Sequence, residues 1–561
     1  MVKSDAEIRR AFAGDNYEVK TCVTFQGMRG YLAEHRTARN AKTQAPKRAL
    51  YVEGDGYQMG YLTGLLAEPD VRLMAIDYVT HVIPAFVSPK LTGLGHTLVV
   101  HVLLSIMRNR LHEAYKRYPK DIPAPLQAEM HGIADGCRAS NSETPVDYDD
   151  VLMLNAGIDG AVAAVYTGIG MQERVKDLLR SGANAAAPIP EPRLPRLEPE
   201  HFQVTGACAA FAAFGRATRD GNFYYGRDFQ FPSAGIFQDT ACLMIHNPTY
   251  KLASGKPALA TVSQNAPGFV GSVVVVNTKG VGVGVDMAPS GNCNPKRPGL
   301  NSLLMVRYAG YCGYSAQDVV TAMVGAHRGS SWIYPIGDAT NQRAVVVEAG
   351  MTVDKLNPLS YPPAELKPLL PAGPFQPSQR GLYARWDNWE YPSEYLQYNR
   401  KLFKHMGFPW TPAQFEERGY INSNWKVGMD QTYFFAPQRE TGADLAIASN
   451  IFLVPEMRLC AMWKWTNLVV KNKMADLIWR YDELNRECLQ AHGQIDEAKA
   501  TELADFLSPD RQFPDYYGDN RTIEGSVSVC NLTERTIKSH FGYHDDEWVK
   551  LRLREYVAEG A

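Results

Sequence analysis

A segment that no regular secondary structure can continue divides this chain in two. Residues 181–203 read SGANAAAPIPEPRLPRLEPEHFQ. Proline lacks a backbone N–H and its ring blocks the preceding turn, so such a segment can extend neither a helix nor a central strand. The sequence therefore predicts an exposed linker over residues 181–207. It separates an N-terminal segment, 1–180, from a second unit, 208–561.

The hydrophobic patterns on the two sides of the linker differ. Apolar residues at three- and four-residue spacing predict a mainly helical N-terminal segment. After the linker, short runs rich in Val, Ala and aromatic residues alternate with turn signals and predict strands, including 445–453 and 525–541. A helical region over 468–506 lies between these last two strands. This order predicts an α+β fold with layered sheets, and residues 353–420 form an irregular Pro- and aromatic-rich insertion.

Charge and cysteine usage exclude several classes of protein. The formal net charge is -2 and the Lys and Arg residues are scattered, which argues against a nucleic-acid partner. The nine cysteines contain no CxxC pair, so no zinc site is supported, and they indicate reduced thiols. The start of the chain shows no secretory signal, and the longest apolar run, 94–107, is too short to cross a membrane. We expect a cytoplasmic protein with no membrane span.

Several familiar catalytic motifs are missing. The sequence contains no GxSxG elbow, no HExxH and no phosphate-binding loop, which disfavours a serine or metal hydrolase. The run GVGVGVD at 280–286 has alternating glycines inside a strand pattern, so we interpret it as a strand with close neighbours, not as a nucleotide site.

The residue with the most distinctive setting is Cys208, at the first strand after the linker. If the peptide bond between Ala207 and Cys208 were broken, one residue would carry both a thiol and a free amine. An α-amino group has a pKa of about 7.7–8, so it can accept a proton near neutral pH. A thiol needs only a modest shift toward thiolate to become a strong nucleophile. In isolation, a strand cysteine is more often part of the core.

A second pair of candidates lies on the strand that returns toward Cys208. Arg227 can lower the pKa of the thiol by its charge, and the Asp228 carboxylate can hold the amine by a charge-assisted hydrogen bond. The exposed linker would let the new chain ends separate after cleavage. This ordered set predicts a chain that cuts itself between Ala207 and Cys208.

The set resembles the choloylglycine-hydrolase-like branch of the N-terminal-nucleophile hydrolases, and within it the autoproteolytic acyltransferases typified by isopenicillin N acyltransferase. Weak matches to that family's signatures follow one another in the expected order along most of the chain. They are 54–64, 129–136 with 154–156, 271–277 with Gly280, 347–348, 448–452, 455–458, 525–530 and 534–536.

This resemblance implies a four-layer αββα sandwich in which Cys208 is the nucleophile and Arg227 its neighbour. Asn277 and Asn450 fall where the family supplies asparagines for the oxyanion hole and for orienting the substrate. A donor of this kind contributes roughly 3 kcal/mol to stabilising a tetrahedral intermediate. Taken alone, each asparagine is better explained by turn stabilisation.

The sequence departs from the family at two points. Where the family has a carboxylate, this chain has Gln230, so either Gln230 binds the amine as a neutral acceptor or a bulge brings Asp228 to it. The family's later arginine has no clear counterpart, and Lys471 or Lys473 are the candidates to replace it.

The resemblance thus implies a self-processing amidohydrolase or acyltransferase that acts on a linear amide with an apolar acyl group, without metal or organic cofactor. Its own cleaved N-terminal chain would remain bound as a partner. A phospholipase B-like esterase on the same scaffold and an unprocessed, non-enzymatic relative are the alternatives. The natural substrate, the acyl acceptor and the presence of a homo-oligomer are left open.

Overall fold

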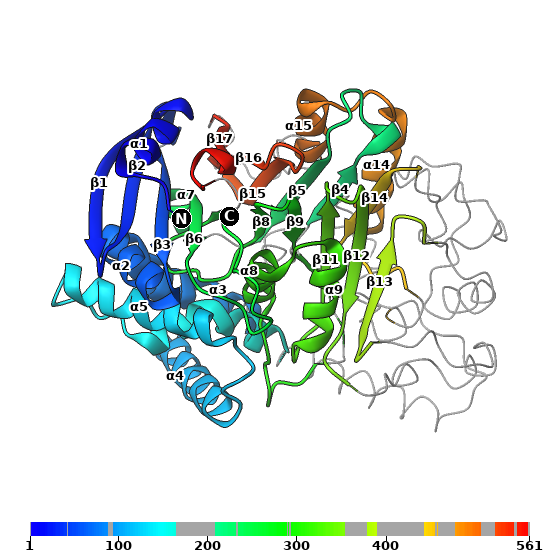
Figure 1. The fold of residues 1–561 in the computed structure, drawn as a ribbon. Helices are drawn as coiled ribbons and strands as arrows, with labels where there is room; N and C mark the ends of the chain where they lie inside the picture. Colours follow the sequence, from blue (N-terminus) through cyan, green and yellow to red (C-terminus); the bar gives the residue numbers. More distant parts are fainter. Residues whose placement is uncertain are drawn as a thin grey trace, which may run out of the picture.

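The computed structural model describes most of the chain on both sides of the linker (Figure 1). The described residues are 2–41, 43–87, 94–163, 208–231, 234–288, 290, 293–353, 379–389, 442–454, 457, 477–506, 522–543 and 547–558. The linker 181–207 lies outside them, as does most of the interval 353–420. The protein is a mixed α/β structure built on two large sheets.

Within the described part of the chain, the larger sheet has eleven strands. Its order is β1-β2-β3-β6-β7-β8-β9-β11-β12-β13, and β10 pairs with β11. The bounds are β1 Tyr17–Phe25, β2 Met28–Arg39, β3 Pro46–Gly54, β6 Cys242–Pro248, β7 Thr261–Asn265, β8 Val274–Asn277, β9 Val281–Gly284, β10 Asp286–Met287, β11 Trp332–Asp338, β12 Arg343–Ala349 and β13 Leu382–Trp386.

This sheet adds three strands to the N-terminal segment, whose described residues are otherwise mostly helical. Three of its strands, β1 to β3, come from residues 17–54, and β3 pairs in parallel with β6 from the other side of the linker. The two parts of the chain therefore share one sheet. The strand β3 is hard to recognise in the sequence because it is buried along most of its length. It therefore lacks the alternation of apolar and polar residues that marks a half-buried strand. The interval 353–420 likewise contributes β13 at the edge of the sheet.

Among the residues that the structure describes, the smaller sheet has six strands, in the order β14-β4-β5-β15-β16-β17, and these pair antiparallel. The bounds are β4 Ala209–Ala213, β5 Tyr224–Gln230, β14 Leu445–Ser449, β15 Thr522–Asn531, β16 Thr536–Tyr543 and β17 Val549–Arg552. It contacts the larger sheet through β11 with β4 and β14, through β12 with β14, and through β7 with β16.

Helices pack against both sheets. α2 lies on β1, β2 and β3, α8 on β8 and β9, and α9 on β11 and β12, whereas α14 and α15 lie on the smaller sheet. The bounds are α1 Asp5–Gly14, α2 Gly56–Arg72, the π-helical turn η1 Leu73–Tyr78, α3 Val79–Val87, α4 Leu94–Arg117, α5 Ala124–Ser140, α7 Ile236–Thr240, α8 Ser302–Cys312, α9 Ala316–Gly325, α14 Leu477–Gln490 and α15 Glu497–Asp505. Residues 148–163 are also helical.

Glycines at four-residue spacing bring α2 and α5 into close contact. A Cβ atom on Gly60 would lie 2.0 Å from the Glu129 carbonyl oxygen, and one on Gly132 would lie 2.2 Å from the Tyr57 carbonyl oxygen. The same holds for Gly64 of α2. Residues four apart lie on one face of a helix, so these glycines form a flat stripe that only glycine permits. This contact explains the Gly-rich motif at 54–64.

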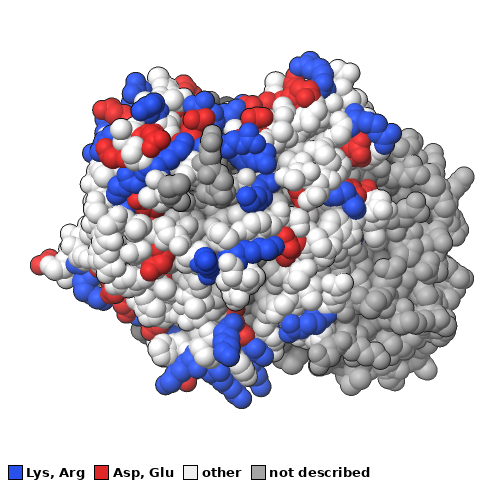
Figure 2. Space-filling view, in the orientation of Figure 1, with Lys and Arg blue, Asp and Glu red and all other residues white. Residues whose placement is uncertain are grey.

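Charged side chains of both signs are interspersed over much of the face shown in Figure 2, and basic side chains gather at its lower end, near α4. Within the described ranges, none of the helices combines the length and the hydropathy that crossing a bilayer requires.

Candidate active site

Cys208 lies immediately before β4, which is a central strand of the smaller sheet. Both neighbours of β4 run antiparallel to it, so the start of β4 lies beside the end of β5 and the end of β14. Ala209 pairs with Asp228 on one side and with Ser449 on the other. The sheet register alone therefore brings the ends of three strands together at this cysteine.

The polar contacts of Cys208 come from those two neighbouring strand ends. Its backbone nitrogen donates to Asn450 Oδ1 at 2.5 Å, and its thiol lies 3.5 Å from the Gln230 carbonyl oxygen, which accepts from it. Asn450 Nδ2 in turn donates to the Met287 carbonyl oxygen at 2.7 Å. That second bond fixes the amide so that its oxygen faces Cys208. The residue is only 1% exposed, yet it has polar partners.

Arg227 occupies the face of β5 that is turned toward the larger sheet. Its guanidinium group donates to the carbonyl oxygens of Ala209, Asp228 and Val285, and its Nη1 lies 2.8 Å from Asp286 Oδ1. A Cβ atom on Gly284 would lie 3.0 Å from Arg227 side-chain atoms. Gly284 thus makes room for Arg227 and Gly282 for Leu532, as a strand with close neighbours should.

Asp228 and Gln230 share the other face of β5. Gln230 Nε2 donates to Asp228 Oδ1, and Arg480 Nη2 donates to Asp228 Oδ2 at 2.8 Å. The pairing of β5 with β4 and β15 is regular, so the bulge that would carry Asp228 to the amine of Cys208 is not present. Asp228 instead forms a buried ion pair with α14.

Burial and charge act in opposite directions on the thiol. Burial raises the pKa of Cys208, the Arg227 guanidinium lowers it, and the Asp286 carboxylate raises it again. Burial also raises the pKa of Asp228 and that of Asp286 to about 6, although Arg480 and Arg227 stabilise both carboxylates. In this closed arrangement Cys208 is therefore held as a thiol, with one guanidinium placed to stabilise the thiolate.

Asn277 does not join this cluster. Its Nδ2 donates to the carbonyl oxygens of Gly310 and Gly313, and its Oδ1 accepts from the backbone nitrogens of Lys279 and Val281. Val275, two residues earlier, packs on Gly310 of α8. Side chains two apart share a face of a strand, so Asn277 faces α8 and not the smaller sheet. The turn-stabilising interpretation describes its contacts.

Sequence reasoning missed two charged residues. Asp286 is the last residue of the GVGVGVD run. Because it is two residues from Gly284, it is expected on the same strand face as that glycine, which approaches Arg227. Arg480 of α14 pairs with Asp228, whereas Lys471 and Lys473 lie outside the described residues. Ala207, the other side of the predicted cleavage point, also lies outside them.

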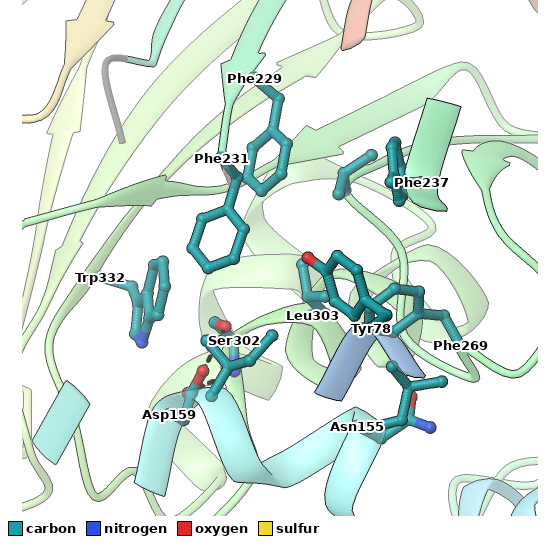
Figure 3. Close-up of a pocket in the computed structure, with 13 residues that line it drawn as sticks. Tyr78, Asn155, Asp159, Phe229, Phe231, Phe237, Phe269, Ser302, Leu303 and Trp332 are labelled. Atoms are coloured by element: carbon teal, nitrogen blue, oxygen red, sulfur yellow. Dashed lines mark hydrogen bonds between the residues drawn. The ribbon is translucent and has the colours of Figure 1, made fainter. Parts of the chain in front are cut away.

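An apolar pocket lies beside the end of β5, where Gln230 contacts Cys208. Phe229 and Phe231 flank Gln230, and their rings point into a small cavity of about 30 Å³ (Figure 3). The helix 148–163 supplies Asp159 on the opposite side. The other lining residues are Tyr78, Leu154, Asn155, Ile158, Phe237, Phe269, Val273, Ser302, Leu303 and Trp332.

The polar groups of this pocket are already bonded to the protein. Asp159 accepts from the backbone nitrogen and the hydroxyl of Ser302 and from the Ser330 hydroxyl. Asn155 bonds to the 268–271 turn. The pocket thus offers mainly apolar surface to a ligand. In the part of the chain that the structure describes, no group of His, Cys, Asp and Glu is arranged to hold a metal ion.

Comparison with known proteins gives distant matches. No family model matches the sequence. The chain is 26% identical over 551 residues to an uncharacterized protein of Archaeoglobus fulgidus. The matched region covers 98% of this chain and 71% of that protein. Two variants of the conjugated bile acid hydrolase from Clostridium perfringens match in structure with 12% identity and a TM-score of 0.33, over 62% of this chain and 93% of theirs. The resemblance to isopenicillin N acyltransferase stays a prediction.

Proposed function

We propose that this protein is a self-processing cysteine amidohydrolase or acyltransferase of the N-terminal-nucleophile type, with Cys208 as its nucleophile. The observation that carries the proposal is the hydrogen bond that the Cys208 backbone nitrogen donates to Asn450 Oδ1. The thiol of the same residue lies close enough to the Arg227 guanidinium for that charge to lower the thiol pKa. A single residue then has a fixed backbone nitrogen and a thiol with a cationic neighbour. A buried structural cysteine needs neither.

The proposed maturation step uses these groups in order. The Cys208 sulfur attacks the Ala207 carbonyl carbon, the C–N bond breaks, and the Cys208 nitrogen takes up a proton to become an amine. Water then hydrolyses the thioester and releases the Ala207 carboxylate and the free thiol. Asn450 Oδ1 is placed to accept from this nitrogen before and after the cut.

Turnover would reuse the same groups. The amine of Cys208 accepts the thiol proton, the sulfur attacks the acyl carbonyl of a linear amide, and the amine returns the proton to the leaving nitrogen. Water or an acceptor amine then resolves the acyl-thioester, which gives hydrolysis or acyl transfer. Arg227 stabilises the thiolate by its charge. Asn450 orients the amine, and Asn277 has no part because it faces α8.

The apolar lining of the pocket supports the proposed substrate class. Phe229 and Phe231 lie on either side of Gln230, whose carbonyl oxygen contacts the thiol, so an apolar acyl group held there would lie near the sulfur. The four-layer αββα arrangement belongs to the same proposal. It is supported by α8 and α9 on the larger sheet and by α14 and α15 on the smaller one.

The test compares wild type, Cys208→Ala and Cys530→Ala, a buried strand cysteine of the same sheet. Intact mass and N-terminal sequencing should show fragments 1–207 and 208–561 for wild type and Cys530→Ala, and one uncut chain for Cys208→Ala. Only the cut proteins should release acid from N-acyl amides of long apolar chains. An uncut, inactive wild type would overturn the proposal in favour of a non-enzymatic relative. Faster cleavage of matched esters than of amides would favour the esterase alternative.

A further inference from the structure

Asp286 is a buried carboxylate without the hydrogen bonds that such groups normally have. It is 0% exposed, and neither of its oxygens accepts a hydrogen bond of regular geometry from the described residues. It forms an ion pair with Arg227, whose Nη1 lies 2.8 Å from Asp286 Oδ1. Buried charges are costly unless they are paired, and unbonded polar atoms in a core need an explanation.

The two-residue strand β10 contacts Arg227 and Asn450, two of the residues that bond to Cys208 or to its neighbour Ala209. Asp286 forms an ion pair with Arg227, and the Met287 carbonyl oxygen accepts a hydrogen bond from the Asn450 side-chain amide. β10 is itself anchored to β11. One short piece of the larger sheet therefore fixes the cationic group and the amide acceptor around the cysteine of the smaller sheet.

The charges around Cys208 are balanced as they stand. Two guanidinium groups, Arg227 of β5 and Arg480 of α14, act on Asp286, and Asp228 pairs with Arg480. With both carboxylates ionised the four groups cancel, so a thiolate on Cys208 would add an uncompensated charge to a dry site. Removal of one carboxylate charge would leave Arg227 free to compensate a thiolate.

Building on the proposed function, we infer that Asp286 is a positioning residue: it holds the Arg227 guanidinium beside Cys208 and offsets its charge, and so controls how readily the thiol gives up its proton. The released proton goes to the Cys208 amine in the cut protein. Asp286 acts through Arg227 and does not itself touch the substrate.

The test measures the rate at which iodoacetamide alkylates Cys208, read from the mass of its peptide, between pH 5 and 10. In Asp286→Asn the midpoint of the rate profile should fall by about one pH unit or more relative to wild type, because a like charge near the thiol is removed. Asp338→Asn, at a buried aspartate that bonds to Ala316 and Asn341, should leave the midpoint unchanged.

A purely structural role for Asp286 would slow alkylation at every pH without moving the midpoint, and that result would overturn the inference. If Asp286→Asn does not fold, Arg227→Met gives the opposite prediction, a midpoint that rises by about one unit. If wild type is cut and active but the midpoint does not move in Asp286→Asn, only the role of Asp286 is refuted. An uncut and inactive wild type refutes the proposed function itself.

Discussion

Asn450 accepts a hydrogen bond from the backbone nitrogen of Cys208 across 2.5 Å, although the two residues lie 242 positions apart in the chain. The contact exists because β14 and β4 are antiparallel neighbours, so the end of one lies at the start of the other. This hydrogen bond links Cys208 to the end of β14, which follows the 353–420 insertion in the sequence.

Removal of this acceptor should impair maturation and turnover together. In Asn450→Ala the buried nitrogen of Cys208 loses its partner, at a cost of about 1–3 kcal/mol, so self-cleavage should slow by roughly 10- to 100-fold. A time course of fragment formation on denaturing gels measures this. Asn277→Ala is the control: it should lower the melting temperature but leave the cleavage rate of the folded protein unchanged. The reverse pattern would contradict the assignment.

Glu348 should act through Asn450 without touching the site. Its carboxylate accepts from the backbone nitrogens of Leu453 and Val454 and from Arg385 Nε at 2.7 Å, so it holds the loop after Asn450. Glu348→Gln replaces an acceptor by a donor and should shift that loop. We expect kcat to fall about 10-fold with little change in KM, since small misplacements are costly.

The control for Glu348 is Asp387→Asn, because Asp387 pairs with Arg343 on the same region of the larger sheet. That variant should keep the kcat of wild type. Equal losses in both variants would indicate general damage to the sheet and not a displaced Asn450.

The contact between α2 and α5 should not tolerate even one methyl group. In Gly60→Ala the new Cβ would lie 2.0 Å from the Glu129 carbonyl oxygen, so the helices must separate, and we expect a loss of about 3 kcal/mol in stability. Gly325→Ala, in α9, meets nothing within 4 Å and should be neutral or slightly stabilising. Thermal unfolding of both variants checks this, and similar melting temperatures would contradict the packing.

The aromatic pocket should select the acyl group. Phe231→Leu removes part of one wall, so kcat/KM for amides of long or aromatic acyl groups should fall about 10-fold, while acetyl amides are little affected. Phe214→Leu, at a ring that stacks on Phe223 elsewhere in the core, serves as the matched variant. A loss that is independent of acyl size would argue against this pocket as the acyl site.

Asp159 should make stability depend on pH. Burial raises its pKa to about 6, above the ordinary value of 3.8, although hydrogen bonds from Ser302, Ser330 and Trp332 oppose the shift. The folded state thus binds more protons than the unfolded state between about pH 4 and 6, and this carboxyl group costs stability as pH rises through that range. Asp159→Asn lacks the cost, so its melting temperature relative to wild type should increase from pH 4 to pH 7. A constant difference would contradict a raised pKa.

The sequence by itself determined the local elements and the chemical types. The strands after residue 207 and the helical region before Phe506 follow from hydrophobic spacing, which depends only on neighbouring residues, whereas the linker stays a prediction. Cys208 and Arg227 stand out by their position in a short pattern and Asn450 by the family resemblance, and these three lie around one strand end.

Only the tertiary structure decided which face each side chain takes and what lies opposite it. Alternation along β8 indicates that Asn277 and Val275 share a face. Because α8 packs on that face, Asn277 points away from Cys208 and the smaller sheet. Asp286 and Arg480 meet Arg227 and Asp228 only because two sheets and a helix stack there. Such contacts join residues far apart in the chain, and their energies come from burial and pairing that no local pattern records.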